Sequence, residues 1–325
     1  MEAGKRLLEV TNLKTYFTIS QGEVKAVDGV SFYVNNGESL GLVGESGCGK
    51  TTTALSVVQL LPENGRIVDG KIMFDGRDLV KLKEKELLDF RWKEASMIFQ
   101  GAMNALNPVK RISDQIAEPI LLHEKLNKKQ AMERVRELFG LVELDPNLMN
   151  SYPHEFSGGM RQRAIIAMAL ACNPKLIIGD EPTTALDVMV QAQIIDLINS
   201  LRHRLGMSMI MITHDLSIIT ETCDRIAVMY AGKIVEHGNT SDVVDLTLHP
   251  YTEKLINAFP NIYKPRIMVD SIPGDPPDLF APPAGCRSSP RCDRAIKGLC
   301  DAVEPPLINM GGEHYVACHL RKGAK

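Results

Sequence analysis

The chain has 325 residues, of which 44% are hydrophobic and 24% are charged, and its formal net charge at pH 7 is -3. This composition is typical of a water-soluble globular protein with room for about two domains. The small negative charge gives no reason to expect nucleic acid or an anionic membrane as a partner. The longest strongly apolar run, residues 164–172, is about half of what a bilayer crossing needs. The first residues show no signal peptide, so we expect a cytosolic location.

The first 35 residues alternate apolar and polar positions, which predicts antiparallel strands joined by a turn at Gln21–Gly22. Residues 39–44, SLGLVG, predict a short buried strand that runs into a glycine-rich loop, and helical character follows in residues 50–61. Further strands are predicted in residues 71–76, 96–100, 176–182 and 207–214. The last two are continuous apolar runs, which are typical of a parallel sheet covered on both faces. We therefore expect an α/β fold.

Between Gln100 and Pro153 the pattern becomes helical, most clearly in residues 127–142. This region is predicted to form a helical insertion, at about residues 101–160, between two strands of the sheet.

The last part of the chain changes character. A hairpin that turns at Ala231–Gly232 is predicted over residues 225–238, and a short helix over residues 250–259. Beyond them the sequence is rich in proline and poor in periodicity. We therefore predict one domain over residues 1–259 and a small irregular extension over residues 260–325.

Residues 44–51, GESGCGKT, match the pattern G-x-x-x-x-G-K-[ST] and lie between a predicted strand and a predicted helix. Glycines let backbone N–H groups converge on phosphates, and the helix adds the positive end of its dipole. Lys50 is expected to reach the β- and γ-phosphates of ATP, and Thr51 to ligate Mg²⁺. A glycine-rich turn that binds nothing is the alternative. The predicted nucleotide-binding residues of this loop are Gly44, Glu45, Ser46, Gly47, Cys48, Gly49, Lys50, Thr51 and Thr52.

The thiol of Cys48 lies beside Lys50 and a helix N-terminus in the sequence, and both features lower the pKa of a thiol. We therefore expect Cys48 to be the most readily alkylated cysteine outside the C-terminal tail, although an inert small residue fits the motif equally well. Cys172 and Cys223 lie in apolar helical contexts and are predicted to be core residues.

A buried strand is predicted to end at two adjacent carboxylates, Asp180 and Glu181. Ligands bind at the carboxyl ends of strands in open α/β sheets. Asp180 is suited to hold Mg²⁺, and Glu181 to orient and polarise the attacking water.

Two other polar residues follow predicted strands. The amide of Gln100 could reach both the metal ion and the water, with a solvated loop glutamine as the alternative. His214 is expected to contact the γ-phosphate, although a lone histidine is more often structural or solvated.

Residues 154–163, HEFSGGMRQR, resemble the signature sequence of ATP-binding cassette (ABC) ATPases. Ser157, Gly158 and Gly159 open an apolar helix, which makes a second anion-binding helix N-terminus in the chain. The resemblance implies that two such chains dimerise head to tail, with the signature of each closing over the ATP of the other.

The remaining ABC elements appear in the family order. The Q-loop, the D-loop and the switch histidine match Gln100, Asp187 and His214. Phe17, or else Tyr16, matches the aromatic residue that stacks on adenine, with a core role as the alternative. The resemblance extends from about Leu7 to Phe259 and implies catalytic roles for Gln100, Glu181 and His214.

Within this family, residues 100–109, 155–187 and 271–286 resemble the ATP-binding subunits of dipeptide and oligopeptide importers, a group that includes nickel and some oligosaccharide systems. The resemblance implies an ATPase at the cytoplasmic face of the membrane. Its partners would be two transmembrane permeases, a second ATPase subunit and an extracytoplasmic peptide-binding protein, but no nucleic acid. A soluble ABC ATPase that acts on ribosomes is disfavoured, because the chain has one cassette and an insertion too short for a coiled coil.

The last 40 residues hold four of the seven cysteines, namely Cys286, Cys292, Cys300 and Cys318. A cytosolic location disfavours disulfides, and zinc ligands usually arrive in closer pairs, although His314 and His319 leave a mixed zinc site open. An iron–sulfur cluster is larger than one ion, so wider loops can wrap around it. Members of the subgroup that the tail resembles carry such a cluster here. The resemblance therefore implies a [4Fe–4S] cluster on these four cysteines, with Zn²⁺ as the alternative.

Overall fold

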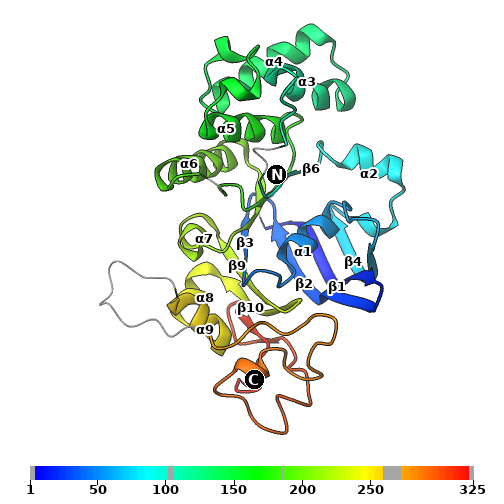
Figure 1. Ribbon diagram of the computed structural model, residues 1–325, viewed down its shortest axis with the longest axis vertical. Helices are drawn as coiled ribbons and strands as arrows, with labels where there is room; N and C mark the ends of the chain where they lie inside the picture. Colours follow the sequence, from blue (N-terminus) through cyan, green and yellow to red (C-terminus); the bar gives the residue numbers. More distant parts are fainter. Residues whose placement is uncertain (1–3, 102–104, 185, 259–271, 322–325) are drawn as a thin grey trace. The chain divides into compact units, whose positions relative to one another are not determined.

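The computed structural model describes residues 4–101, 105–184, 186–258 and 272–321 (Figure 1). The chain divides into two compact units, each described by itself below. The first unit comprises residues 1–5, 35–38 and 81–211, and the second comprises residues 6–34, 39–80 and 212–325. The predicted domain boundary at residues 259–260 lies outside the described residues.

The first unit contains three strands, in the sheet order β8-β7-β6. They are β6 (Ala95–Ile98), β7 (Leu176–Asp180) and β8 (Ser208–Ile212). β6 and β7 pair in parallel, with Ile98 opposite Gly179. Every residue of β7 and β8 is buried, which confirms that these continuous apolar runs are strands covered on both faces.

The helices of the first unit are α2 (Glu84–Phe90), α3 (Ile112–His123), α4 (Lys128–Leu141), α5 (Gly158–Ala169) and α6 (Val188–Leu205), with short 3₁₀ turns at Pro146–Leu148 and Pro153–Glu155. α3, α4 and α5 pack against one another, and Figure 1 shows them gathered together. α4 confirms the helix predicted over residues 127–142. It begins with a capping box, in which the side chains of Asn127 and Gln130 each accept the other's backbone N–H.

The second unit contains an antiparallel sheet with the strand order β2-β1-β4-β5. Its strands are β1 (Arg6–Ile19), β2 (Gly22–Asn35), β4 (Gly65–Phe74) and β5 (Arg77–Asp78). β1 and β2 confirm the two strands predicted in the first 35 residues. β1 pairs antiparallel with β4, which places Phe17 opposite Gly65.

Five further strands of the second unit lie in the order β11-β12-β10-β9-β3. They are β3 (Ser39–Val43), β9 (Arg225–Tyr230), β10 (Lys233–Asn239), β11 (Ile308–Asn309) and β12 (Tyr315–Val316). β3 is parallel to β9, and β9 and β10 form the predicted hairpin. Ala231 and Gly232 turn it with φ angles of 47° and 82°. β12 pairs antiparallel with β10, so the C-terminal extension continues this sheet.

The helices of the second unit are α1 (Lys50–Val57), α7 (Leu216–Thr222), α8 (Thr240–Asp245) and α9 (Pro250–Asn257), with 3₁₀ turns at Leu79–Lys81 and Ser289–Arg291. A hydrogen bond of 2.8 Å between the hydroxyls of Ser56 and Thr15 joins α1 to β1. In the described parts of both units, every helix is too short or too polar to cross a membrane.

Candidate nucleotide and cysteine sites

The predicted phosphate loop connects β3 to α1 in the second unit, and close backbone approaches explain two of its glycines. A Cβ atom added to Gly44 would lie 2.2 Å from the carbonyl oxygen of Met229. A Cβ atom added to Gly49 would lie 2.3 Å from the carbonyl oxygen of Ala26. Both glycines also have positive φ angles, of 147° and 106°. The loop therefore keeps this shape only with glycine at both positions.

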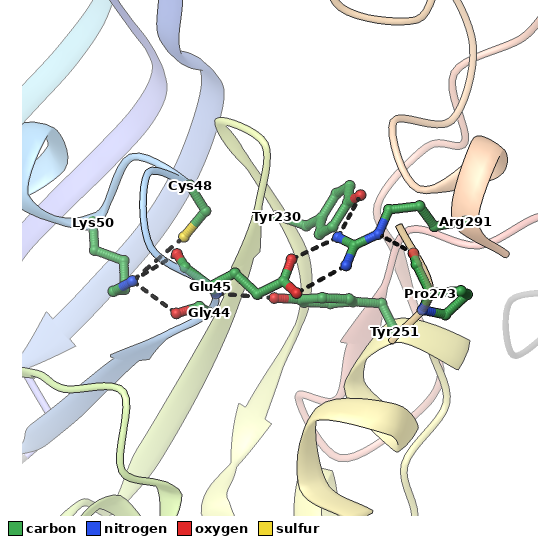
Figure 2. A network of polar contacts seen from close by, with 8 residues as sticks. All are labelled: Gly44, Glu45, Cys48, Lys50, Tyr230, Tyr251, Pro273 and Arg291. Atoms are coloured by element: carbon green, nitrogen blue, oxygen red, sulfur yellow. Dashed lines mark hydrogen bonds and ion pairs between the residues drawn. The ribbon is translucent and has the colours of Figure 1, made fainter. Parts of the chain in front are cut away.

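Lys50 begins α1 and its side chain folds back over the loop (Figure 2). Its Nζ donates hydrogen bonds of 2.7 Å to the carbonyl oxygen of Gly44 and 3.0 Å to that of Glu45. Thr51 lies exposed in the first turn of the helix. The structure thus brings the lysine, the loop backbone and the threonine together as the motif predicts.

The thiol of Cys48 is buried, which bears on the expectation that it reacts readily. The side chain is 4% exposed. Burial raises the pKa of the Cys48 thiol above its ordinary value, although the charge of Lys50 acts in the opposite direction. These observations favour the alternative of an inert small residue over a readily alkylated thiol, because desolvation outweighs the neighbouring lysine. Cys172 and Cys223 are buried, as predicted.

Glu45 is held by residues that the sequence did not point to (Figure 2). Its backbone N–H donates to the Tyr251 hydroxyl at 3.0 Å. Its carboxylate accepts from both terminal nitrogens of Arg291, at 2.7 and 3.0 Å. These contacts join positions 206 and 246 residues apart, so no local pattern could have indicated them.

The first unit carries the adjacent carboxylates at the end of β7. Asp180 is 2% exposed, and Glu181 adopts a left-handed backbone with a φ angle of 47°. Gln100 donates from Nε2 to Glu181 Oε2 at 2.7 Å, and the Thr184 hydroxyl donates to the same oxygen at 3.2 Å. The structure thus brings the predicted glutamine and glutamate together, and it adds a contact from Thr184, the first residue of the predicted D-loop. Strained backbone of this kind often occurs at functional sites.

The predicted signature residues lie at the start of α5, also in the first unit. The side chain of Ser157 accepts the N–H of Met160 at 3.3 Å, so this serine caps the helix. Gly159 lies close to Val190, whose Cγ1 would be 2.9 Å from an added Cβ. Asp187 of the predicted D-loop caps α6 by accepting the N–H of Val190 at 3.0 Å. The signature helix and the D-loop helix therefore meet at Val190.

The remaining predicted nucleotide contacts lie in the second unit. His214 is exposed after β8. Tyr16 donates its hydroxyl to Asp28 at 2.7 Å, and burial together with this bond raises the pKa of the Tyr16 hydroxyl. Phe17 lies over Gly65, with ring carbon Cε1 2.7 Å from where a Cβ of that glycine would be. The assignment of Phe17 to adenine stays a prediction.

All four cysteines of the extension line one small pocket, together with His249 and His319. His314, the second histidine of the alternative mixed zinc site, does not line this pocket. It instead forms a 2.8 Å hydrogen bond with Glu236. The seven cysteines, all of them within the described ranges, carry free thiols. The extension thus brings together four thiols that lie up to 32 residues apart in the chain.

Three of these thiols each accept a hydrogen bond from one backbone N–H group. Cys292 accepts the N–H of Arg294, Cys318 accepts that of Leu320, and Cys300 accepts that of Ile296 at 3.3 Å. Burial raises the pKa of the Cys292 and Cys318 thiols. Across the described residues, three or more His, Cys, Asp or Glu side chains nowhere come together in an arrangement that would hold a single metal ion.

Comparison with known sequences defines the class of this protein. Residues 27–184 match the family "ABC transporter", and residues 235–300 match the family "Oligopeptide/dipeptide transporter, C-terminal region". The solved structures of similar fold include the ATP-binding cassette MJ0796 in a dimeric post-hydrolysis state bound to ADP and Pi. Its TM-score is 0.65 at 25% identity, covering 72% of this chain and 98% of that one. CbiO1 from Clostridium perfringens has a TM-score of 0.64 at 26% identity, covering 75% and 96%.

The relatives are closer in sequence than these structures. A probable peptide ABC transporter ATP-binding protein of Sinorhizobium fredii, y4tR, is 46% identical, with 96% of this chain and 94% of that protein covered. The dipeptide transport ATP-binding protein DppD of Bacillus subtilis is 44% identical, with 98% and 95% covered. The oligopeptide transport ATP-binding protein OppD of Escherichia coli is 46% identical, with 96% and 92% covered. The chain therefore belongs to the ABC transporter ATP-binding proteins, in the group with the oligopeptide/dipeptide C-terminal region.

Proposed function

We propose that this chain is the ATP-hydrolysing subunit of an ABC importer of dipeptides or oligopeptides. The observation that carries the proposal is the presence, in one chain, of a complete phosphate loop, two adjacent carboxylates of which Glu181 is held by Gln100, and the peptide-transporter C-terminal region. Relatives aligned over nearly their whole length are named as peptide transport ATP-binding proteins, which favours peptides over nickel or oligosaccharides as cargo.

The proposed roles in hydrolysis follow from side-chain chemistry. Lys50 would neutralise phosphate charge, and Glu181 would accept a hydrogen bond from the attacking water and polarise it. Gln100 holds Glu181 Oε2 at 2.7 Å, so it keeps the carboxylate in place for that task. His214 would stabilise charge on the transferred phosphoryl group.

The side chains that we propose for Mg²⁺ carry the oxygen donors that suit this ion, namely a hydroxyl, a carboxylate and an amide. Thr51, Asp180 and Gln100 are the residues that would hold it. When bound, the ion supplies positive charge against the phosphates.

The proposed working form is a dimer of two ATPase subunits at the cytoplasmic face of the membrane, bound to two permease subunits. An extracytoplasmic peptide-binding protein would deliver the cargo. Ser157, Gly158 and Gly159 of each ATPase subunit would face the γ-phosphate bound by the other, since a helix N-terminus stabilises anions. Asp187 would lie beside the same interface.

Two measurements test this proposal. Tagged protein purified with its membrane partners should retain permease subunits and, reconstituted in vesicles, should take up a labelled dipeptide or oligopeptide when ATP is supplied. Glu181→Gln should still bind ATP but should abolish both ATPase activity and uptake, and it should accumulate nucleotide-bound dimer. ATPase activity that responds to nickel or a sugar but to no peptide would reject the proposed cargo. Co-purification with ribosomes instead of permeases would reject the transporter itself.

We also propose that Cys286, Cys292, Cys300 and Cys318 hold a [4Fe–4S] cluster. The support is that four free thiols line one pocket, and that three of them accept backbone N–H groups, which stabilise thiolate charge. When bound, the cluster would tie the irregular extension together.

Iron and acid-labile sulfide analysis tests this second proposal. Protein purified without oxygen should be brown, with about four irons and four sulfides per chain. Cys300→Ser should lose most of both. Stoichiometric zinc without iron in the same preparation would favour the zinc alternative.

A further inference from the structure

The extension contacts the rest of the second unit through arginines that flank its cysteines. Arg287, which follows Cys286, donates to the carbonyl oxygen of Ala231 and to the carboxylate of Asp28. Arg321, three residues after Cys318, donates from Nε to the carbonyl oxygen of Leu248 at 2.9 Å. The four-cysteine segment is therefore attached to the ATPase at positions next to its own thiols.

The third arginine contacts the phosphate loop itself (Figure 2). Arg291, directly before Cys292, forms a two-pronged pair with Glu45, which is the second residue of the loop. The Arg291 side chain is 8% exposed and that of Glu45 is 25% exposed, so water screens this pair only weakly. The hydrogen bonds to Glu45 raise the pKa of Arg291, so the guanidinium stays charged.

Neighbouring groups fix the guanidinium in its place. Arg291 donates from Nε to the carbonyl oxygen of Pro273 at 2.7 Å and from Nη1 to the Tyr230 hydroxyl at 3.2 Å. Both partners of the pair are thus oriented by the surrounding structure. A planar guanidinium satisfies this geometry, whereas a lysine ammonium would make one of the two carboxylate bonds at a time.

The pair also removes an electrostatic problem for nucleotide binding. Glu45 places a carboxylate in a loop that must receive phosphates, and its own carbonyl oxygen is a partner of Lys50 Nζ at 3.0 Å. Without Arg291 this carboxylate would be partly buried and unpaired. The unpaired Glu45 carboxylate would then repel phosphate, and it would also draw Lys50 away from the phosphate.

We propose that Arg291 is a positioning residue that holds the phosphate loop through Glu45, so that the state of the four-cysteine segment sets the affinity of the loop for ATP. The link to the cysteine segment depends on the proposed cluster, whereas the action of Arg291 on the loop does not. A group bound by the cysteines would order the segment and so keep Arg291 against Glu45. Loss of that group would loosen Arg291 and lower the ATP affinity of the loop.

The first experiment measures binding of a fluorescent ATP analogue to the full-length chain. Arg291→Ala should weaken binding about tenfold, and Arg291→Lys should give an intermediate loss. Arg6→Ala is the control, because it removes an exposed arginine–glutamate pair with Glu9 in the same unit, away from the cysteines. The control should bind like the unchanged protein.

A double-mutant cycle separates positioning from a general structural effect. In a Glu45→Gln background, Arg291→Ala should change ATP affinity less than twofold, because its target is already gone. An equal loss in both backgrounds, or unchanged affinity in Arg291→Ala, would overturn the proposal. If Arg291→Ala lowers the melting temperature, the double-mutant cycle is repeated with Arg291→Lys in place of Arg291→Ala.

The second experiment compares ATP affinity before and after iron is removed by an anaerobic chelator. The unchanged protein should lose about tenfold in affinity on stripping, whereas Arg291→Ala should be weak in both states. Equal ATP affinity of the protein with iron and the protein without iron would overturn the proposal that the cysteine segment controls ATP binding. A preparation without iron contradicts the proposed cluster. The double-mutant cycle then tests only whether Arg291 acts on the phosphate loop through Glu45.

Discussion

At the scale of single residues, burial decides which charged and titratable groups have unusual chemistry. Cys48 and Lys50 are neighbours in the phosphate loop, and the lysine alone would make the thiol more acidic. The surrounding protein excludes water from Cys48, and that effect is the larger one. Sequence neighbours therefore give the sign of one contribution to a pKa, while burial can reverse the total.

The first prediction concerns labelling of Cys48. Because its thiol is buried and its pKa is raised, N-ethylmaleimide at pH 7 should modify it at least about tenfold more slowly than in the unfolded chain. Mass spectrometry of timed digests measures this rate. Cys48→Ala should leave the labelling of the other six cysteines unchanged. Rapid modification of Cys48 in the folded chain would contradict the burial argument.

The second prediction concerns His237, which stacks on Tyr315 with ring centroids 4.5 Å apart. Burial, and then the charges of Arg225 and His314, lower the pKa of His237 from 6.5 to about 4. Between these values the unfolded chain binds a proton that the folded chain does not. Stability should therefore fall as the pH falls through this window, by at most about 3 kcal/mol from this group.

Urea unfolding at several pH values measures that slope. His237→Phe keeps a stacked ring and removes the titrating nitrogens, so the loss of stability between pH 6.5 and 4 should become smaller. An unchanged slope in the variant would assign the pH dependence to other groups.

At the scale of elements, the strands and the phosphate loop could be predicted because each is a local pattern. Continuous apolar runs indicated β7 and β8, and a glycine-rich loop between a strand and a helix indicated the phosphate loop. The hairpin of β9 and β10 was predictable for the same reason, since its turn residues adopt left-handed backbone.

The contacts of the extension could not be predicted in this way. Arg291 meets Glu45 only because the tail folds back onto the loop. Similarly, the role of Tyr251 as an acceptor for the Glu45 N–H depends on the docking of α9. Hydrogen bonds between distant segments have no periodicity that a sequence would display.

The third prediction concerns the start of α4, where Asn127 accepts the N–H of Gln130 at 3.0 Å. Asn127→Ala removes this acceptor and should reduce the free energy of unfolding by about 1 kcal/mol. Chemical denaturation measures the loss. Lys129→Ala, an exposed change in the first turn of the same helix, should cost much less. Equal losses would show that the cap contributes nothing of its own.

At the scale of the second unit, the extension is part of the fold and not a loose tail. β12 adds to the edge of β10, and Arg287 and Arg291 pair with Asp28 and Glu45. A buried carboxylate, Glu236 on β10, joins these parts from the inside. This organisation explains how a segment with few apolar residues can keep a fixed position.

The fourth prediction tests Glu236, whose side chain is fully buried. Its carboxylate accepts the backbone N–H groups of Leu248 and His249, at 2.8 and 2.9 Å, and contacts His314 Nε2 at 2.8 Å. Glu236→Gln replaces one acceptor oxygen with a donor that faces other donors, which should cost about 3 kcal/mol. Because the bonds to Glu236 hold both the start of α9 and the extension, weakening them should make the extension sensitive to protease first. Limited trypsin digestion with mass spectrometry should find early cleavage at Arg287 or Arg291 in the variant.

The control variant is Glu304→Gln, which changes an exposed partner of Lys233 and should be digested like the unchanged protein. If the two variants give the same cleavage pattern and the same melting temperature, Glu236 does not anchor the extension.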